Sequence, residues 1–243
     1  MDYHSSNRCR SGRRLERRDE LSRYERNAPA ITEAEQELLA AKRALVAGCG
    51  GLGGYIIEFL GRVGVGHITA VDGDVFAISN LNRQLLSTEE TIGKPKAECA
   101  KERMAVVNPG INVTPVWEFL TEENAAALVA GHDIIVDALD NGKTRILLSA
   151  AARDAGIPFV SGAIGGWHGR VIVLYPGDNV DFLWQGEPPA PIGNLCFIAA
   201  HVASVQAAET VKVLLNRPGV IQGKLLEIDI LNARWDEIPL DFS

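Results

Sequence analysis

Short apolar runs alternate with amphipathic segments along most of the chain, from Ile31 onward. Runs rich in Val, Ile, Leu and Ala predict buried strands at residues 43–47, 68–71, 111–117, 133–138 and 158–161. The segments between these runs predict helices at residues 32–41, 52–63, 95–107, 122–130 and 143–155. Strands joined by helices of this length form parallel βαβ units, with helices on both faces of one sheet.

The last third of the chain has a different pattern. It predicts a strand at residues 170–175, a long loop rich in Pro and Gly at 176–195, a helix at 197–215, and strands at 224–230 and 234–238. These elements favour a mixed sheet. The chain is therefore predicted to be an α/β protein with a Rossmann-like, mostly parallel sheet, extended by antiparallel strands near the C-terminus.

The composition fits one large domain. The chain has 243 residues, of which 47% are hydrophobic, and a formal net charge of −7. No apolar run approaches the roughly 20 residues that span a bilayer, and the N-terminus lacks the apolar core of a signal peptide. The four cysteines lie far apart without a CxxC pair, which disfavours a disulfide scaffold and a zinc ribbon. We expect a cytoplasmic protein without a membrane partner.

The charge is distributed unevenly along the chain. Residues 1–26 hold eight Arg against five Asp and Glu, whereas the remaining residues hold 16 Lys and Arg against 26 Asp and Glu. Basic N-terminal arms often bind nucleic acid, but this arm lacks aromatic interleaving and is attached to an acidic body. We therefore expect residues 1–20 to be a disordered basic leader, and we do not expect nucleic acid as a partner.

A glycine-rich loop follows the first predicted strand and opens the next helix. In this GxGxxG arrangement, backbone N–H groups and the positive end of the helix face a phosphate. The candidate contacts are Gly48, Gly50, Gly51, Leu52 and Gly53. Asp72 ends the next strand, where an acid accepts hydrogen bonds from ribose hydroxyls. The pattern indicates an adenine nucleotide; the alternative is a turn that only packs a helix on a sheet. Cys49 is interpreted as a small packing residue.

Further polar residues follow the strands on the same side of the predicted sheet. They lie in the stretches Asn80-Leu81-Asn82-Arg83-Gln84, Gly93-Lys94-Pro95-Lys96 and Asp137-Ala138-Leu139-Asp140-Asn141. Arg83 and Lys96 are cations that can face the mouth of an open α/β sheet. Asp140 suits Mg²⁺, which takes one or two carboxylates together with phosphate oxygens. Each residue alone could be a solvated surface residue. The set as a whole argues against a dehydrogenase, because hydride transfer would not require these residues.

Together these motifs resemble those of the ThiF/MoeB/HesA adenylyltransferases, the bacterial relatives of ubiquitin-activating enzymes. The resemblance covers about residues 22–238 and is more specific than a lone GxGxxG. It rests on Gly-Cys-Gly-Gly-Leu-Gly at 48–53, Asp-Gly-Asp at 72–74, Asn-Leu-Asn-Arg-Gln at 80–84, Gly-Lys-Pro-Lys at 93–96 and Asp-Asn at 140–141. The stretch Arg-Tyr-Glu-Arg-Asn at 23–27 is similar to an N-terminal family element whose second arginine reaches the partner subunit's ATP site. The resemblance thus implies a homodimer in which Arg26 completes the neighbouring site.

The resemblance implies that residues 21–243 form a single ATP-binding adenylyltransferase domain. The family reaction uses ATP to adenylate the C-terminal Gly-Gly carboxylate of a ubiquitin-like sulfur carrier, in thiamine or molybdopterin synthesis, and releases pyrophosphate. That carboxylate is ionised at neutral pH, so no general base is needed. The barrier is the approach of an anion to an anionic α-phosphate, which cationic clamping and positioning lower.

The resemblance also implies a role for each candidate residue. Arg83, Lys96 and the partner's Arg26 would contact the triphosphate and its developing charge. Asp140 would hold Mg²⁺, and Asp72 would hold the ribose. The other nucleotide contacts would be Asp74, Asn80, Asn141 and the glycine loop.

The sequence departs from the family pattern at two places. Many members hold zinc with two CxxC pairs, but the corresponding stretch reads Asn-Val-Asp-Phe-Leu-Trp at 179–184, so no structural zinc is predicted. Some members form a covalent intermediate on a cysteine in the loop before the last long helix. Cys196 is the nearby thiol in the sequence, but it falls several residues late, at the helix start. We interpret Cys196 as a buried structural residue, with a catalytic thiol as the alternative.

Other functions stay open at this point. An NAD-dependent oxidoreductase would leave Arg83, Lys96 and Asp140 without roles. A relative of the tRNA threonylcarbamoyladenosine dehydratases, which adenylate a carbonyl on a modified nucleoside, would need RNA binding, and the acidic body does not favour it. A non-catalytic module that docks a carrier would not need the complete set of nucleotide contacts.

Overall fold

The computed structural model describes residues 23–185 and 192–240. Its strands are β1 (Arg43–Ala47), β2 (His67–Val71), β3 (Asn112–Val116), β4 (Ile134–Asp137), β5 (Phe159–Gly165), β6 (His168–Leu174), β7 (Lys224–Asp229) and β8 (Arg234–Pro239). They form one eight-stranded sheet in the order β3-β2-β1-β4-β5-β6-β7-β8. Neighbours from β3 to β5 are parallel and those from β5 to β8 are antiparallel. The predicted Rossmann-like sheet with an antiparallel extension is confirmed.

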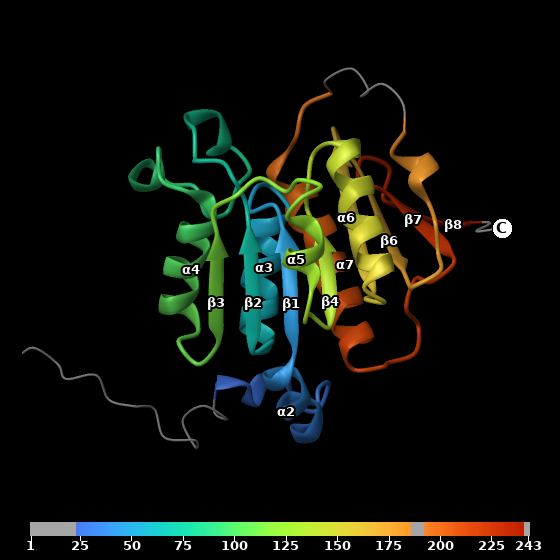
Figure 1. The fold of residues 1–243 in the computed structure, drawn as a ribbon, viewed down its shortest axis with the longest axis horizontal. Helices are drawn as coiled ribbons and strands as arrows, with labels where there is room; N and C mark the ends of the chain where they lie inside the picture. Colours follow the sequence, from blue (N-terminus) through green and yellow to red (C-terminus); the bar gives the residue numbers. More distant parts are fainter. Residues whose placement is uncertain (1–22, 186–191, 241–243) are drawn as a thin grey trace, which may run out of the picture.

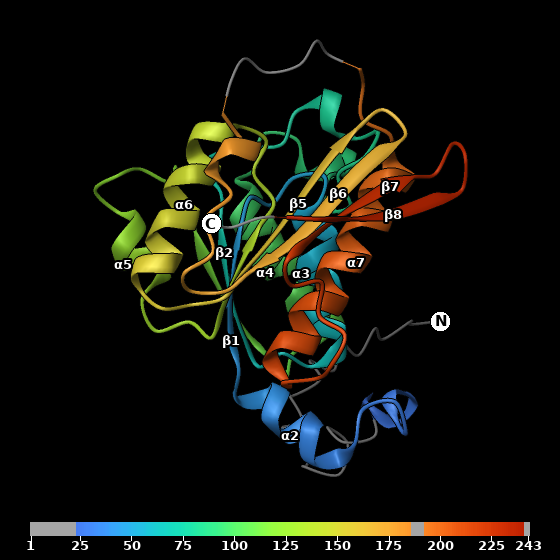
Figure 2. The ribbon, with the colours of Figure 1, turned by 90° about the vertical axis from the view of Figure 1, so that its right-hand side faces the viewer.

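Helices cover both faces of this sheet (Figure 1). The α-helices are α2 (Glu33–Ala41), α3 (Gly53–Val63), α4 (Lys96–Val107), α5 (Ala125–Val129), α6 (Gly142–Asp154) and α7 (Cys196–Leu214). The short 3-10 helices are η1 (Glu25–Asn27), η2 (Ile78–Asn80), η3 (Glu89–Thr91) and η4 (Asp181–Leu183). Figure 2 shows α3, α4 and α7 on one face and α5 and α6 on the other. The layers are those expected when parallel strands are joined by helical crossovers.

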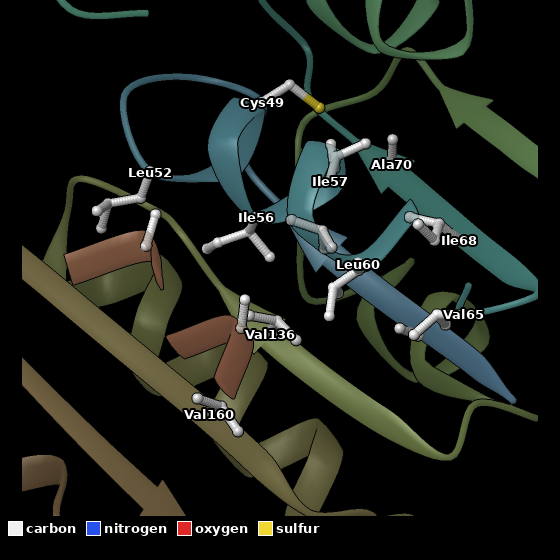
Figure 3. Packing of buried hydrophobic residues seen from close by; sticks show 14 of the residues in the cluster. Cys49, Leu52, Ile56, Ile57, Leu60, Val65, Ile68, Ala70, Val136 and Val160 are labelled. Atoms are coloured by element: carbon white, nitrogen blue, oxygen red, sulfur yellow. The ribbon is translucent and has the colours of Figure 1, made fainter. Parts of the chain in front are cut away.

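Two apolar cores lie on the two faces of the sheet. In the larger core, Ile56 and Leu60 of α3 lie beside strand residues such as Ile68 and Val136 (Figure 3). The second core lies beneath α5 and α6 and includes Leu148. Because both faces are covered, successive residues of the central strands are buried, which explains their nearly continuous apolar runs.

Two predicted element boundaries were wrong by three residues or more. The helix predicted from residue 122 begins at Ala125, because the Asn124 side chain accepts a hydrogen bond from the Thr121 N–H and donates one to the Phe119 carbonyl. These bonds hold residues 119–124 in a turn. Strand β5 continues to Gly165, past the predicted end, because it pairs with β6 along its whole length as a hairpin.

The parallel strands end together at one edge of the sheet, which we call the carboxyl edge (top of Figure 1). The segment with η1 and α2 lies at the opposite, amino edge. There Arg23 Nη1 donates to the Val107 carbonyl at 2.8 Å, and Asn108 Nδ2 donates to Tyr24 Oη at 2.7 Å. The predicted leader, residues 1–20, lies outside the described residues. Within the described ranges, no helix combines the length and the hydropathy needed to cross a membrane.

Candidate functional site

The glycine loop turns sharply between β1 and α3. Gly48 has a φ of +93°, and its N–H donates to the Val71 carbonyl at 2.8 Å. A Cβ at Gly53 would lie 1.7 Å from the Gly48 carbonyl oxygen, so only glycine fits there. The resulting turn leaves the first N–H groups of α3 at the carboxyl edge, where they can bind an anion. Cys49 is fully buried, and burial raises the pKa of its thiol, which confirms its interpretation as a packing residue.

Asp72 is held against the glycine loop. Its Oδ2 accepts from the Cys49 N–H at 2.7 Å, and its Oδ1 accepts from the Asp74 N–H at 2.8 Å. Burial raises the pKa of Asp72, and the two N–H donors oppose that shift. Each carboxylate oxygen can accept a further hydrogen bond. The geometry thus fixes an acceptor next to the loop.

Lys96 is a buried cation at the first residue of α4, with 7% of its surface exposed. Its Nζ lies 3.2 Å from Asp74 Oδ2. Burial of a charge costs free energy, and a positive charge at a helix N-terminus is opposed by the helix dipole. Lys96 is therefore a candidate to contact an anion at this edge, with Asp74 as its ion-pair partner in the structure.

Arg83 lies over the glycine loop. A Cβ at Gly51 would lie 3.9 Å from Arg83 Cγ and Nε. Its Nη1 donates to the Ser79 carbonyl at 3.0 Å and to Asn82 Oδ1 at 2.8 Å. These bonds hold the guanidinium above the loop. Asn80 shapes the same turn, because its Oδ1 accepts from the Ala77 N–H at 2.9 Å.

Gln84 also faces the loop, although it was not among the predicted site residues. Its Nε2 lies 3.4 Å from the position of a Cβ on Gly50. The residue is 7% exposed, and its Oε1 has no hydrogen-bond partner in the described part of the chain. A buried amide oxygen without a protein partner is uncommon, and here it lies beside the loop. Its place in the polar stretch 80–84 was the available sequence signal.

The turn after β4 packs against the glycine loop and carries Asp140. A Cβ at Gly48 would lie 2.6 Å from the Ala138 carbonyl oxygen, two residues before Asp140. Asp140 is exposed and makes no ion pair within residues 23–185 and 192–240. Asn141 caps α6, since its Oδ1 accepts from the Thr144 N–H at 2.9 Å. The structure therefore places Asp140 at the carboxyl edge and gives Asn141 a capping role.

A buried polar network beneath this turn was missed by sequence reasoning. Arg145 Nη1 lies 3.3 Å from Asp137 Oδ2, which also accepts from Ser161 Oγ at 2.6 Å. Asp137 Oδ1 accepts from the Leu139 N–H at 2.9 Å, and Arg145 Nη2 donates to the Leu139 carbonyl. Burial raises the pKa of Asp137, and Arg145 opposes that shift. The network fixes both backbone polar groups of Leu139, directly before Asp140.

Cys196 starts α7 at this same edge, but it is exposed. Its interpretation as a buried residue was therefore wrong. The helix meets the sheet only from Ile198 onward, so its first turn projects beyond the core. Asn82 Nδ2 donates to the Asn194 carbonyl at 3.1 Å, which ties the segment before Cys196 to the turn that carries Arg83.

Arg26 is the predicted site residue that the structure keeps away from the others. It is exposed, and it lies in η1 at the amino edge of the sheet (Figure 1). The glycine loop lies at the other end of the same strands. The fold therefore brings together Asp72, Asp74, Asn80, Arg83, Lys96, Asp140 and Asn141 around the loop, and it separates Arg26 from them.

Comparisons with known proteins agree with this geometry. A model of the ThiF family matches residues 24–242. The SAMP-activating enzyme E1 of Haloferax volcanii is 35% identical over 230 residues, which cover 90% of this chain and 85% of that protein. The sulfur carrier protein adenylyltransferase of Thermus thermophilus is 36% identical over 239 residues, with 92% and 88% covered.

A solved structure of Escherichia coli MccB superposes with a TM-score of 0.79 at 20% identity, over 91% of this chain and 70% of that one. At this identity the likeness concerns the fold. The family match covers nearly all of the sequence, and the two relatives share more than 30% of their residues with it over most of their length. The chain belongs to the ThiF family.

Proposed function

We propose that the chain is an ATP-dependent adenylyltransferase that activates the C-terminal Gly-Gly carboxylate of a ubiquitin-like sulfur carrier and releases pyrophosphate. The main support is that the glycine loop, Asp72, Arg83 and Lys96 lie together at the carboxyl edge of the sheet. The related proteins named above, a SAMP-activating enzyme and a sulfur carrier protein adenylyltransferase, support the choice of substrate. They also favour adenylation over NAD-dependent oxidation. The carrier would serve sulfur transfer in the cytoplasm, as in thiamine or molybdopterin synthesis.

The arrangement accommodates each part of ATP. The phosphates would lie against the N–H groups of the loop and the N-terminus of α3, where the helix dipole favours negative charge. The ribose hydroxyls would donate to Asp72, which retains acceptor capacity beyond its bonds to Cys49 and Asp74. The unpartnered Oε1 of Gln84 could accept a further donor beside the loop.

The reaction needs charge neutralisation rather than proton transfer. A carboxylate oxygen of the carrier attacks the α-phosphorus, the bond from that phosphorus to the β-phosphate oxygen breaks, and pyrophosphate leaves with the bonding electrons. The products are the carrier acyl adenylate and pyrophosphate. Arg83 and Lys96 would reduce the repulsion between the two anions and stabilise the charge on the leaving group. A bound phosphate would compete with Asp74 for the Lys96 ammonium.

Asp140 fits Mg²⁺ that arrives with ATP. It is an exposed carboxylate without an ion-pair partner in the described ranges, and these ranges hold no cluster of three or more His, Cys, Asp or Glu that could bind a metal. One carboxylate together with phosphate oxygens is a common set of Mg²⁺ ligands. When bound, Mg²⁺ would neutralise part of the phosphate charge.

Arg26 would act on the site of a second subunit. The segment η1 lies at the amino edge, where the neighbouring Tyr24 accepts from Asn108, whereas the glycine loop follows β1 at the carboxyl edge, so the two lie at opposite ends of the strands. A homodimer that brings the amino edge of one subunit to the carboxyl edge of the other would supply the cation. The proposal rests on the resemblance of residues 23–27 to the family element, and the exposed position of Arg26 in η1 is compatible with it.

Exchange of labelled pyrophosphate into ATP tests the proposed site. We expect exchange only with a carrier that ends in Gly-Gly, and a fall of at least about 100-fold in the Arg83→Ala and Asp140→Ala variants, the size found when one transition-state contact is removed. Lys101→Ala and Glu102→Ala are matched controls, because both residues are exposed on α4. Undiminished exchange in both site variants would contradict the assignment.

The same assay tests the role of Arg26. Arg26→Ala and Asp140→Ala are each expected to lose exchange, and mixed dimers of the two variants should recover part of it, since one of their two sites is intact. Mixed dimers that are verified by mass and yet stay inactive would rule out an arginine supplied between subunits.

A further inference from the structure

Three buried polar side chains from three separate elements meet beneath the turn that follows β4. Asp137 ends β4, Arg145 lies on α6 and Ser161 lies on β5, and none of them is more than 7% exposed. Burying two charges costs free energy, and apolar residues of similar volume in their place often give a fold of equal stability. The stability of the fold alone therefore does not require these residues.

The hydrogen bonds of the three side chains converge on the backbone of Leu139. Arg145 donates from Nη1 to Ser161 Oγ at 3.2 Å and from Nη2 to the Leu139 carbonyl. Ser161 Oγ donates to Asp137 Oδ2 at 2.6 Å, and Asp137 Oδ1 accepts from the Leu139 N–H at 2.9 Å. Both polar groups of this backbone are thus bonded to buried side chains. Leu139 directly precedes Asp140.

The first part of the same turn is held by other contacts. The Ala138 N–H donates to the Ala47 carbonyl at 2.8 Å, and the Asp137 carbonyl accepts from Gln206 Nε2 at 2.8 Å. Ala138 is also the residue whose carbonyl packs against the glycine loop. Because these contacts do not involve the buried side-chain bonds, loss of those bonds should release Leu139 and leave the loop in place.

We propose that Arg145 and Ser161 are positioning residues that hold the Asp140 carboxylate in the direction in which it binds Mg²⁺ with ATP. The inference rests on the proposed function, in which Asp140 is the Mg²⁺ ligand. Asp140 is exposed and makes no ion pair in the described part of the chain, so the backbone of the turn sets its direction. Groups that orient a metal ligand raise metal affinity, because the ligand loses less freedom on binding.

Calorimetric titration of the whole protein with ATP, once with excess Mg²⁺ and once with EDTA, tests this role. Arg145→Lys keeps a positive charge beside Asp137, but one ammonium group cannot replace the fork that bonds Ser161 and Leu139 together. We expect the Kd for ATP with Mg²⁺ to rise about tenfold, the loss seen when a group that orients a metal ligand is removed. The Kd with EDTA should stay within about twofold of wild type, as for an independent site.

Ser161→Ala keeps the test decisive if Arg145→Lys does not fold, since it removes one hydroxyl and leaves the ion pair in place. Its Kd for ATP should rise about threefold or more with Mg²⁺, the effect of losing one hydrogen bond, and should not rise with EDTA. Ser149→Ala, at a buried serine one turn further along α6, should change neither Kd. In an Asp140→Asn background Ser161→Ala should have no further effect, because no carboxylate remains to be positioned.

Amide hydrogen exchange in the nucleotide-free protein gives a readout that does not depend on Mg²⁺. The Leu139 N–H should exchange about fivefold faster in Ser161→Ala, because its acceptor Asp137 is held less firmly. Equal losses of ATP affinity with Mg²⁺ and with EDTA would overturn the positioning role, and so would wild-type affinity in the folded variants. A wild-type protein that binds ATP under neither condition would instead contradict the proposed function itself.

Discussion

Asp137 and Arg145 are a buried ion pair beneath the turn that carries Asp140. Their side chains are 0% and 8% exposed, and Ser161 bonds to both. Removing one member of such a pair leaves a charge in the interior without a counterpart. Since the pair also holds Leu139, it links the stability of the fold to the position of the proposed Mg²⁺ ligand.

The Arg145→Met variant is expected to lower the free energy of unfolding by about 3–5 kcal/mol, because Asp137 loses its buried partner. Urea denaturation at neutral pH measures this change. The matched control is Arg170→Met, since Arg170 is a 58% exposed arginine paired with Glu227. That substitution should cost less than about 1 kcal/mol. An equal loss of unfolding free energy in the two variants would show that the buried pair stabilises the fold no more than the exposed pair does.

Glu35 of helix α2 forms an ion pair that connects this helix to the segment after α7. Thr32 and Glu35 form a capping box at the start of α2. Glu35 also accepts from Arg217, which follows α7, at 2.8 and 2.6 Å. The bond from Arg217 and those from Thr32 lower the pKa of Glu35 from 4.5 to about 2. This carboxylate thus connects elements far apart in the sequence.

The lowered pKa makes the attachment of α2 sensitive to acid. The contribution of Glu35 to stability is complete above the pKa of the unfolded chain and is lost as the pH falls toward about 2. Wild type should therefore lose more free energy of unfolding than Glu35→Gln between about pH 5 and pH 3. Urea midpoints over that range measure the difference, and Glu37→Gln, at an exposed position of the same helix, should follow wild type. Equal slopes for all three proteins would refute the role of Glu35.

The helices and strands were largely predictable because the sequence features that determine them lie within or next to each element. The apolar runs that became β1 and β4 are buried on both faces, and Gly48 permits the turn between β1 and α3. The errors arose where hydrogen bonds, rather than the apolar pattern, set the end of an element. Asn124 holds a local turn in place of the first turn of α5, and backbone pairing with β6 extends β5. Neither contact leaves a periodic signal in the sequence.

The candidate site was predictable to the same degree. Asp72 and Asp140 directly follow strands, so parallel pairing brings them to one edge whatever the details of packing. The ion pair of Asp137 with Arg145 depends on how separate elements pack together. The exposure of Cys196 likewise depends on where α7 first meets the sheet.

In the whole molecule, the proposed reaction site lies at the carboxyl edge of the sheet, and the segment η1 with Arg26 lies at the amino edge. The sequence beyond residue 26 is strongly acidic, so Arg83 and Lys96 are cations in a body that otherwise repels phosphate. An arginine from a second subunit would add to the positive charge where pyrophosphate develops.

The most direct test of the account is the intact mass of a Gly-Gly carrier after incubation with the protein, ATP and Mg²⁺. Formation of the acyl adenylate predicts a carrier whose mass increases by that of AMP less one water, with one pyrophosphate released per adduct. A carrier that ends in a C-terminal amide should not be modified, because it lacks the attacking carboxylate. ATP binding without any AMP adduct on the Gly-Gly carrier would contradict the central claim.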